Sequence, residues 1–147
     1  MNIELLRADV SSLKVDAIIN PASANKPVPD FGSASVGQAV VTSGGNVLCK
    51  FVIHAIVPHH GDGDEDAKLR NAMWAALKRA EELAIASVAM PPVPATFGFP
   101  RGHCSRVLMS TALDFRPHAR SLQRVVFCAF SEDAYSQLQR ALEEIDA

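Results

Sequence analysis

The chain has 147 residues and a hydrophobic content of 48%, which together predict a single domain, residues 1–147, with enough apolar side chains for a buried core. Charged residues make up 20% and the net charge is −2, so we expect no nucleic-acid partner and no attraction to anionic membranes. The longest apolar runs, such as FVIHAIV, are far shorter than a spanning helix, and MNIELLRAD has no signal-peptide pattern, so we expect a cytoplasmic protein without membrane contact.

The sequence predicts strands and loops in the first half of the chain. Residues 2–7 and 15–19 predict short strands, and the second of them is a continuous apolar run of the kind buried on both faces of a sheet. Residues 21–37 are rich in turn formers and show no periodicity, which predicts a long loop. Residues 38–46, QAVVTSGGN, then suggest a strand and a turn, and residues 50–57 suggest another buried strand.

The second half alternates helices with strands. A stripe of apolar residues spaced by four and three predicts a helix from Glu65 to about Ala86; it contains Leu69, Met73, Leu77, Ala80 and Ala84. A second helix is predicted over 102–115, with Cys104, Leu108, Thr111, Ala112 and Phe115 facing inward. Residues 87–90 and 124–130 predict strands, and the last helix begins at the capping residue Ser131, with Ala134, Leu138, Leu142 and Ile145 facing inward.

Apolar strands that alternate with helices favour an α/β sandwich with a largely parallel sheet. In such open sheets, ligands bind in the crevice outside the carboxyl ends of the strands. Three loops leave those ends, namely the segments that follow DAIIN, SVAM and FCAF. The candidate site is therefore expected in these loops.

The order of the segments resembles the macro domain family of ADP-ribose-binding modules. The matching pieces are ADVSSLKVDAIINPAS, GQAVVTSGGNVLCKFVIHAIVP, SVAMPPVPATFGFP and RVVFCAFSEDAY, which together span almost the whole chain. The resemblance implies a three-layer α/β/α sandwich with a mixed, largely parallel sheet and a cleft for an adenosine nucleotide. It implies no metal and no cofactor.

The resemblance assigns roles to individual residues. Asp9 would accept a hydrogen bond from the adenine amino group, with Val10 beside it, and Phe130 would stack on the adenine ring. Asn20 matches the first asparagine of the family's Asn-Ala-Ala-Asn motif. The remaining expected contacts lie in the loop around the distal ribose and comprise Ala95, Thr96, Phe97, Gly98 and Phe99, together with Ser23.

The sequence departs from the family pattern at the phosphate loops. Ser23 replaces the second asparagine, and the glycine-rich first loop and the helix that normally follows it are missing. A diphosphate is held mainly by successive backbone N–H groups, and proline has none to donate. Pro27 and Pro29 in the first loop and Pro94 in the second therefore predict weakened diphosphate recognition.

Three functions remain open at this point. The first is binding of ADP-ribose or a related adenosine nucleotide, free or on an ADP-ribosylated protein, with little catalysis. The second is hydrolysis of an ADP-ribosyl bond, for which Asp30 is the candidate catalytic base. The third is a ligand-free scaffold for protein interaction. The missing helix would also leave an open sheet flank, which is a reason to consider a homodimer.

Several residues have a structural interpretation beside the functional one. Phe130 is either a core aromatic or the adenine platform, and of Phe97 and Phe99 we expect Phe97 to line the groove and Phe99 to enter the core. The run PHHGDGDEDA has metal-like chemistry, yet we interpret it as a polar loop that leads into a helix. Cys49, Cys104 and Cys128 are odd in number and lie in apolar surroundings, so we expect buried thiols. His54 is expected to be a hydrogen-bonded core residue.

Overall fold

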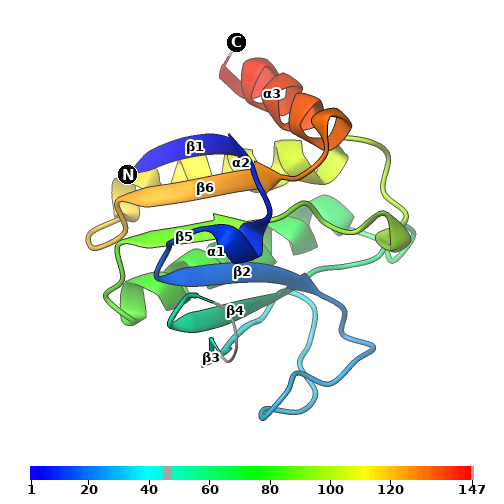
Figure 1. Cartoon of the computed structure of the whole chain (residues 1–147). Coiled ribbons are helices and arrows are strands. Elements are labelled where there is room, and N and C mark those ends of the chain that lie inside the picture. Colours follow the sequence, from blue (N-terminus) through cyan, green and yellow to red (C-terminus); the bar gives the residue numbers. More distant parts are fainter. Residues whose placement is uncertain (45–47, 147) are drawn as a thin grey trace.

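The computed structural model of the chain describes residues 1–44 and 48–146 (Figure 1). One six-stranded sheet has the order β1-β6-β5-β2-β4-β3, and all its pairs are parallel except β3 with β4. The mixed, largely parallel sheet is therefore confirmed. Its strands are β1 (Asn2–Arg7), β2 (Ala17–Ala22), β3 (Ala39–Ser43), β4 (Phe51–Ile56), β5 (Ser87–Met90) and β6 (Arg124–Ala129).

Three α-helices and three short 3₁₀ helices accompany the sheet. They are α1 (Glu65–Glu82), α2 (His103–Phe115), α3 (Glu132–Asp146), η1 (Val10–Ser12), η2 (Ala95–Phe97) and η3 (Arg116–His118). Every predicted strand and α-helix is present, and Ser131 caps α3 as expected, since the Ala134 N–H donates to its Oγ at 3.1 Å. Of the turn predicted after β3, Gly45 and Asn46 lie outside the described residues. Within residues 1–44 and 48–146, no helix has the length and apolarity needed to cross a membrane.

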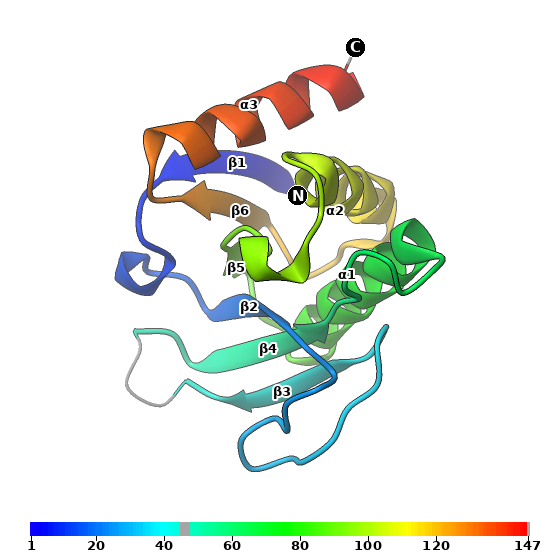
Figure 2. The same ribbon diagram turned by 90° about the vertical axis from the view of Figure 1, so that its right-hand side faces the viewer.

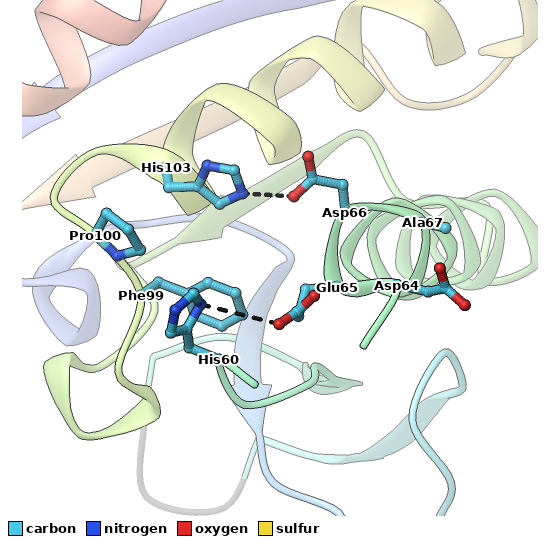
Figure 3. Close-up of a pocket in the computed structure, with 8 residues that line it drawn as sticks. All are labelled: His60, Asp64, Glu65, Asp66, Ala67, Phe99, Pro100 and His103. Atoms are coloured by element: carbon cyan, nitrogen blue, oxygen red, sulfur yellow. Dashed lines mark hydrogen bonds and ion pairs between the residues drawn. The ribbon is translucent and has the colours of Figure 1, made fainter. Parts of the chain in front are cut away.

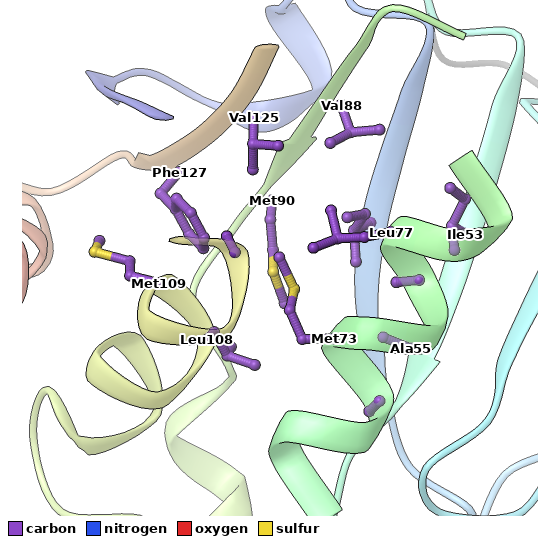
Figure 4. Close-up of a cluster of buried hydrophobic side chains, with 14 of the residues drawn as sticks. Ile53, Ala55, Met73, Leu77, Val88, Met90, Leu108, Met109, Val125 and Phe127 are labelled. Carbon is purple, nitrogen blue, oxygen red and sulfur yellow. The ribbon is translucent and has the colours of Figure 1, made fainter. Parts of the chain in front are cut away.

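The main hydrophobic core lies between the sheet and helices α1 and α2, which Figure 2 shows together on one face. Met73 and Leu77 of α1 meet Ile53 of β4 and Met90 of β5 in this core (Figure 4). All four side chains are at most 1% exposed. At roughly 1.5–3 kcal/mol for each fully buried side chain of this size, this layer is the largest apolar contribution to stability.

The opposite face of the sheet is covered by loops. Ile18 lies on this face although its neighbour Ile19 belongs to the main core, which explains why the strand is apolar at both positions. Residues 23–38 contain no helix, as predicted, and form a long loop between β2 and β3. Two buried residues of this loop, Val28 and Ala34, cover Ile56 of β4. The loop therefore covers part of the sheet that was expected to be open.

Helix α1 ends earlier than its apolar pattern predicts. Ala84 lies outside the helix with a φ of 54°, and the Ile85 N–H donates back to the Ala80 carbonyl at 3.3 Å. This is the Schellman type of helix end, in which a residue in the left-handed region reverses the chain. The prediction that Ala84 belongs to the buried stripe is therefore wrong, because a left-handed alanine is not signalled by the sequence.

Asp16 connects the starts of three strands. Its carboxylate Oδ2 accepts from the backbone N–H of Ala86 at 2.9 Å and of Ser87 at 3.1 Å, next to β5. Its carbonyl oxygen accepts from the N–H of Lys50 at 2.9 Å and of Phe51 at 3.3 Å, at the start of β4. The bonds to the carboxylate, led by that from the Ala86 N–H, hold the pKa of Asp16 below its ordinary value.

We predict that Asp16→Ala lowers the free energy of unfolding by about 1–3 kcal/mol, because the N–H groups of Ala86 and Ser87 lose their acceptor. Chemical denaturation measures the loss, with Glu143→Gln on the exposed side of α3 as the control. Since the folded-state pKa is depressed, the wild-type contribution is full above the ordinary value of 3.8 and disappears as the pH falls through the folded value. Equal stability of Asp16→Ala and the control would contradict the role of Asp16.

Candidate functional site

Asp9 and Phe130 lie together at one edge of the sheet. β1 and β6 pair in parallel up to Arg7 and Ala129, so the residues that follow both strands emerge at the same end. The Asp9 side chain is fixed by Ser11, whose N–H and Oγ–H both donate to Oδ1, at 3.0 and 2.8 Å. These bonds, led by the backbone one, keep the pKa of Asp9 low. The result is an exposed, ionised acceptor beside an aromatic ring.

The interpretation of Phe130 as a core aromatic is wrong. Its side chain is 77% exposed, one of three large apolar side chains that stand out in solvent among the described residues. The preceding residue Ala129 is buried, so the chain leaves the sheet at this point and turns the ring outward. An exposed ring one residue past a buried strand is available to stack on a flat ligand. Val10, the residue after Asp9, is half-buried against the loop-covered face.

A cavity of about 500 Å³ opens between the loop after β2, the end of β4 and η2. It brings together four of the predicted site residues, namely Asn20, Ser23, Thr96 and Phe97. Four further polar residues line it that the sequence analysis did not assign to a site: Asn25, Lys26, His54 and His59. The remaining predicted residues, among them Ala95 and Gly98, are not in its lining.

His54 is hydrogen-bonded as predicted, but it faces this cavity instead of the core. Its Nε2 lies 2.9 Å from Thr42 Oγ1, and its Nδ1 lies 3.4 Å from Asn20 Nδ2. Partial burial lowers the pKa of His54 below 6.5, which favours the neutral ring at neutral pH. No local pattern signals this location, because His54 sits within an apolar run.

Several backbone amides of the two loops are engaged within the loops themselves. The N–H of Asn25 donates to Ser23 Oγ, that of Lys26 to the Ser23 carbonyl, and that of Val28 to the Gly32 carbonyl. In η2, the N–H of Phe97 donates to the Pro94 carbonyl and the N–H of Gly98 to the Ala95 carbonyl. Pro27, Pro29 and Pro94 add no donors, so these segments offer fewer amides to a ligand than loops without prolines would.

Phe97 and Phe99 line two different cavities. Phe97 is 8% exposed, packs in the main core, and stacks on His59 with a ring separation of 4.4 Å, so it also forms a wall of the cavity that contains Asn20. Phe99 is half-buried and lines a separate cavity of about 440 Å³. Phe97 therefore packs in the core and also lines the cavity that contains Asn20, whereas Phe99, which was expected in the core, is only half-buried.

The second cavity is lined by four acidic and histidine residues of the PHHGDGDEDA run, namely His60, Asp64, Glu65 and Asp66 (Figure 3). His60 Nδ1 lies 3.9 Å from Glu65 Oε1, and His103 Nε2 lies 2.5 Å from Asp66 Oδ1. Glu65 also accepts from the Gly61 N–H at 2.7 Å, which ties the loop to the start of α1. No three His, Cys, Asp or Glu side chains are grouped to hold a metal ion in the part of the chain that the structure describes.

All three cysteines are buried free thiols, as predicted. Burial, and then the charge of Asp66, raise the pKa of Cys104 to about 12. Burial likewise raises the pKa of Cys128 to about 11. Since the thiolate is the reactive form, Cys104 at the start of α2 is a structural side chain instead of a nucleophile.

Asp30 occupies an exposed turn at the tip of the loop after β2. Its φ is 62°, and an antiparallel bridge between Val28 and Gly32 closes the turn around it. The cavity lining includes Pro27, Val28 and Pro29, and Asp30 is not among the described residues that form it. Asp30 therefore lies outside the lining of the cavity, although it directly follows Pro29.

Comparison with known proteins identifies the family. The model of the Macro domain matches residues 20–108, which include the second half of β2, the residues that line the cavity and the first turns of α2. The chain belongs to the macro domain family. Among relatives, a Saccharolobus solfataricus protein is 29% identical over 99% of the chain and 94% of its own length. The O-acetyl-ADP-ribose deacetylase of Escherichia fergusonii is 26% identical over 97% of the chain and 96% of its own length.

Solved structures share the fold. The Oceanobacillus iheyensis macrodomain with ADP superimposes with a TM-score of 0.85 at 19% identity, over 98% of this chain and 91% of that one. The Trypanosoma brucei macrodomain in complex with ADP superimposes with a TM-score of 0.80 at 22% identity, over 95% of this chain and 68% of that one. This chain therefore has the macro domain fold, in a shortened version in which residues 23–38 contain no helix and loops cover the second face of the sheet.

We predict that the pKa of His54 lies below 6.5, which an NMR titration of its ring protons measures. The unfolded chain then takes up the proton at a higher pH than the folded chain does. The free energy of unfolding should therefore fall as the pH drops from about 6.5 to the folded value, with the contribution of His54 complete above that range. His54→Asn should remove this part of the pH dependence, and a titration of His54 above 6.5 would contradict the assignment.

Proposed function

We propose that this macro domain binds ADP-ribose or a related adenosine nucleotide, and that most of the binding contacts are made to the adenosine end. The observation that carries the proposal is the pair of Asp9 and Phe130 at the common end of β1 and β6. The carboxylate is ionised and exposed, so it can accept from the exocyclic amino group of adenine. The exposed ring of Phe130 offers stacking worth about 1–3 kcal/mol.

Weak diphosphate recognition is the second part of the proposal. Anion-binding loops present consecutive free N–H groups, usually at glycines, and the amides of Lys26, Val28 and Phe97 instead donate within their own loops. Lys26 lines the cavity and is a cation that can attract a phosphate. A single exposed lysine, however, is a weaker and less directional substitute for a cradle of amides.

The adenosine contacts are tested by calorimetric titration with ADP-ribose, ADP, AMP and adenosine. We predict that Asp9→Ala weakens all four ligands by about ten- to a hundredfold, since a hydrogen bond to a charged group is lost. Phe130→Ala should weaken them over a similar range. Asp9→Ser keeps a capping oxygen for η1 without the carboxylate, so it separates adenine recognition from the local fold. Wild-type affinity in Asp9→Ala rules out the adenine contact.

The same titration tests the phosphate loops. We expect the Kd values of ADP and AMP to agree within about threefold, because one phosphate more adds few contacts where the amides are already engaged. A large gain from AMP to ADP would contradict weak diphosphate recognition. If none of the four ligands binds, the scaffold alternative, a ligand-free macro domain for protein interaction, replaces this proposal.

Hydrolysis of an ADP-ribosyl bond is the alternative function. It is motivated by the similarity to the Escherichia fergusonii deacetylase and depends on Asp30 as the base that activates water. We predict that any turnover of an ADP-ribosylated protein by this chain is lost in Asp30→Asn. Asparagine tolerates the left-handed backbone at this position, so the variant removes the carboxylate and leaves the turn intact. Turnover equal to that of wild type would remove Asp30 from the mechanism.

A further inference from the structure

Three polar side chains form a line across the loop-covered face of the sheet. They come from three neighbouring strands: Asn20 on β2, His54 on β4 and Thr42 on β3. Asn20 and His54 are directly paired in the parallel register, and Thr42 lies one diagonal step away, opposite Val52. Their neighbours on the same face are apolar, namely Ile18, Val40, Val52 and Ile56. Three polar side chains in a row on an otherwise apolar face suggest that these residues have a functional role.

The hydrogen bonds in this line depend on one another. A neutral histidine has one donor nitrogen and one acceptor nitrogen. Because His54 Nδ1 faces the amide nitrogen of Asn20, Nδ1 must accept, and the ring proton is then on Nε2. The Nε2–H donates to Thr42 Oγ1, which lies 2.9 Å away. The tautomer of His54 therefore determines the orientation of the Asn20 amide, and the reverse also holds.

The tautomer of His54 determines which amide atom of Asn20 faces the cavity. With Nδ2 directed at His54, the remaining amide atom is the acceptor Oδ1. No protein hydrogen bond to Oδ1 is found among the residues that the structure describes, and Asn20 lines the cavity of about 500 Å³. In the reversed arrangement, His54 would carry its proton on Nδ1, and the cavity would face a donor instead.

We infer that His54, supported by Thr42, is a positioning residue that turns the carbonyl oxygen of Asn20 toward the ligand, so that this end of the cleft selects a sugar hydroxyl over a phosphate. This inference rests on the proposed nucleotide binding. An amide oxygen accepts from the O–H of a ribose diol, whereas it repels the oxygens of an anionic terminal phosphate. At Asn20 the cavity therefore favours a ribose hydroxyl over a phosphate oxygen, although Lys26 in the same lining can attract a phosphate.

The predicted signature is a preference for ADP-ribose over ADP. One neutral hydrogen bond corresponds to an affinity gain of about two- to tenfold, and that preference should be present in the wild-type protein. His54→Leu removes the acceptor that holds the amide, so the preference should fall to about one, with the adenosine affinity unchanged. In His54→Asn, the new amide oxygen takes the place of Nδ1 and should restore the preference.

Thr42 supplies a second pair of variants that leaves His54 in place. Thr42→Val removes the partner of Nε2 and should reduce the preference, whereas Thr42→Ser keeps the hydroxyl and should retain it. If His54→Leu does not fold, the two Thr42 variants still test whether His54 positions the Asn20 amide. A preference for ADP-ribose that survives in His54→Leu and in Thr42→Val overturns the inference.

The tautomer of His54 gives a test that needs no ligand. Nitrogen-15 NMR of the free protein at neutral pH should show the proton on Nε2, and Thr42→Val should shift the tautomer population. A proton on Nδ1 overturns the inference even where ADP-ribose binds. Conversely, failure of all nucleotides to bind together with an Nε2 proton rejects the proposed function, while the coupling between His54 and Asn20 stands.

Discussion

The placement of the site depends on the register of β2 in the middle of the sheet, and that register is held at Asp16. Its carboxylate accepts from the start of β5 while its carbonyl accepts from the start of β4, so three parallel strands begin in alignment. β2 and β4 are then paired over six positions, which sets Asn20 beside His54 at the polar floor of the cavity. A slip of one residue would turn Asn20 into the core and bring its apolar neighbour Ile19 to the cavity.

The elements of the fold are predictable from the sequence because their signals are local. Periodic apolar residues mark α1 and α2, and continuous apolar runs mark the buried strands, so the alternation of helices and strands follows from these patterns alone. The end of α1 does not, because Ala84 reverses the chain in a conformation that usually calls for glycine. The helix-capping role of Ser131, by contrast, is a local pattern and is predicted correctly.

The site is predictable only where it follows the resemblance. Asp9, Asn20 and Phe97 are recognised from motifs: Asp9 follows β1, Asn20 lies within β2, and Phe97 lies in η2 beyond β5. His54 is not recognised, because its environment is set by strand pairing between residues far apart in the chain and by what covers the sheet. Within an apolar strand, a histidine produces the same sequence signal whether it lies in a core or on the floor of a cavity.

One change in the sequence accounts for both unusual features of this macro domain. The short connection of residues 23–38 has no helix, and the same segment contains the prolines and the self-paired amides that leave few donors for a phosphate. A helix over this face would be expected to bury the polar line that Asn20 and His54 form. The loop instead covers only the patch around Ile56 and leaves that line at the floor of a cavity. Under the proposed function, the reduced set of amide donors and the accessible side chain of Asn20 both follow from the connection of residues 23–38, and together they favour a ligand recognised by its base and its hydroxyls.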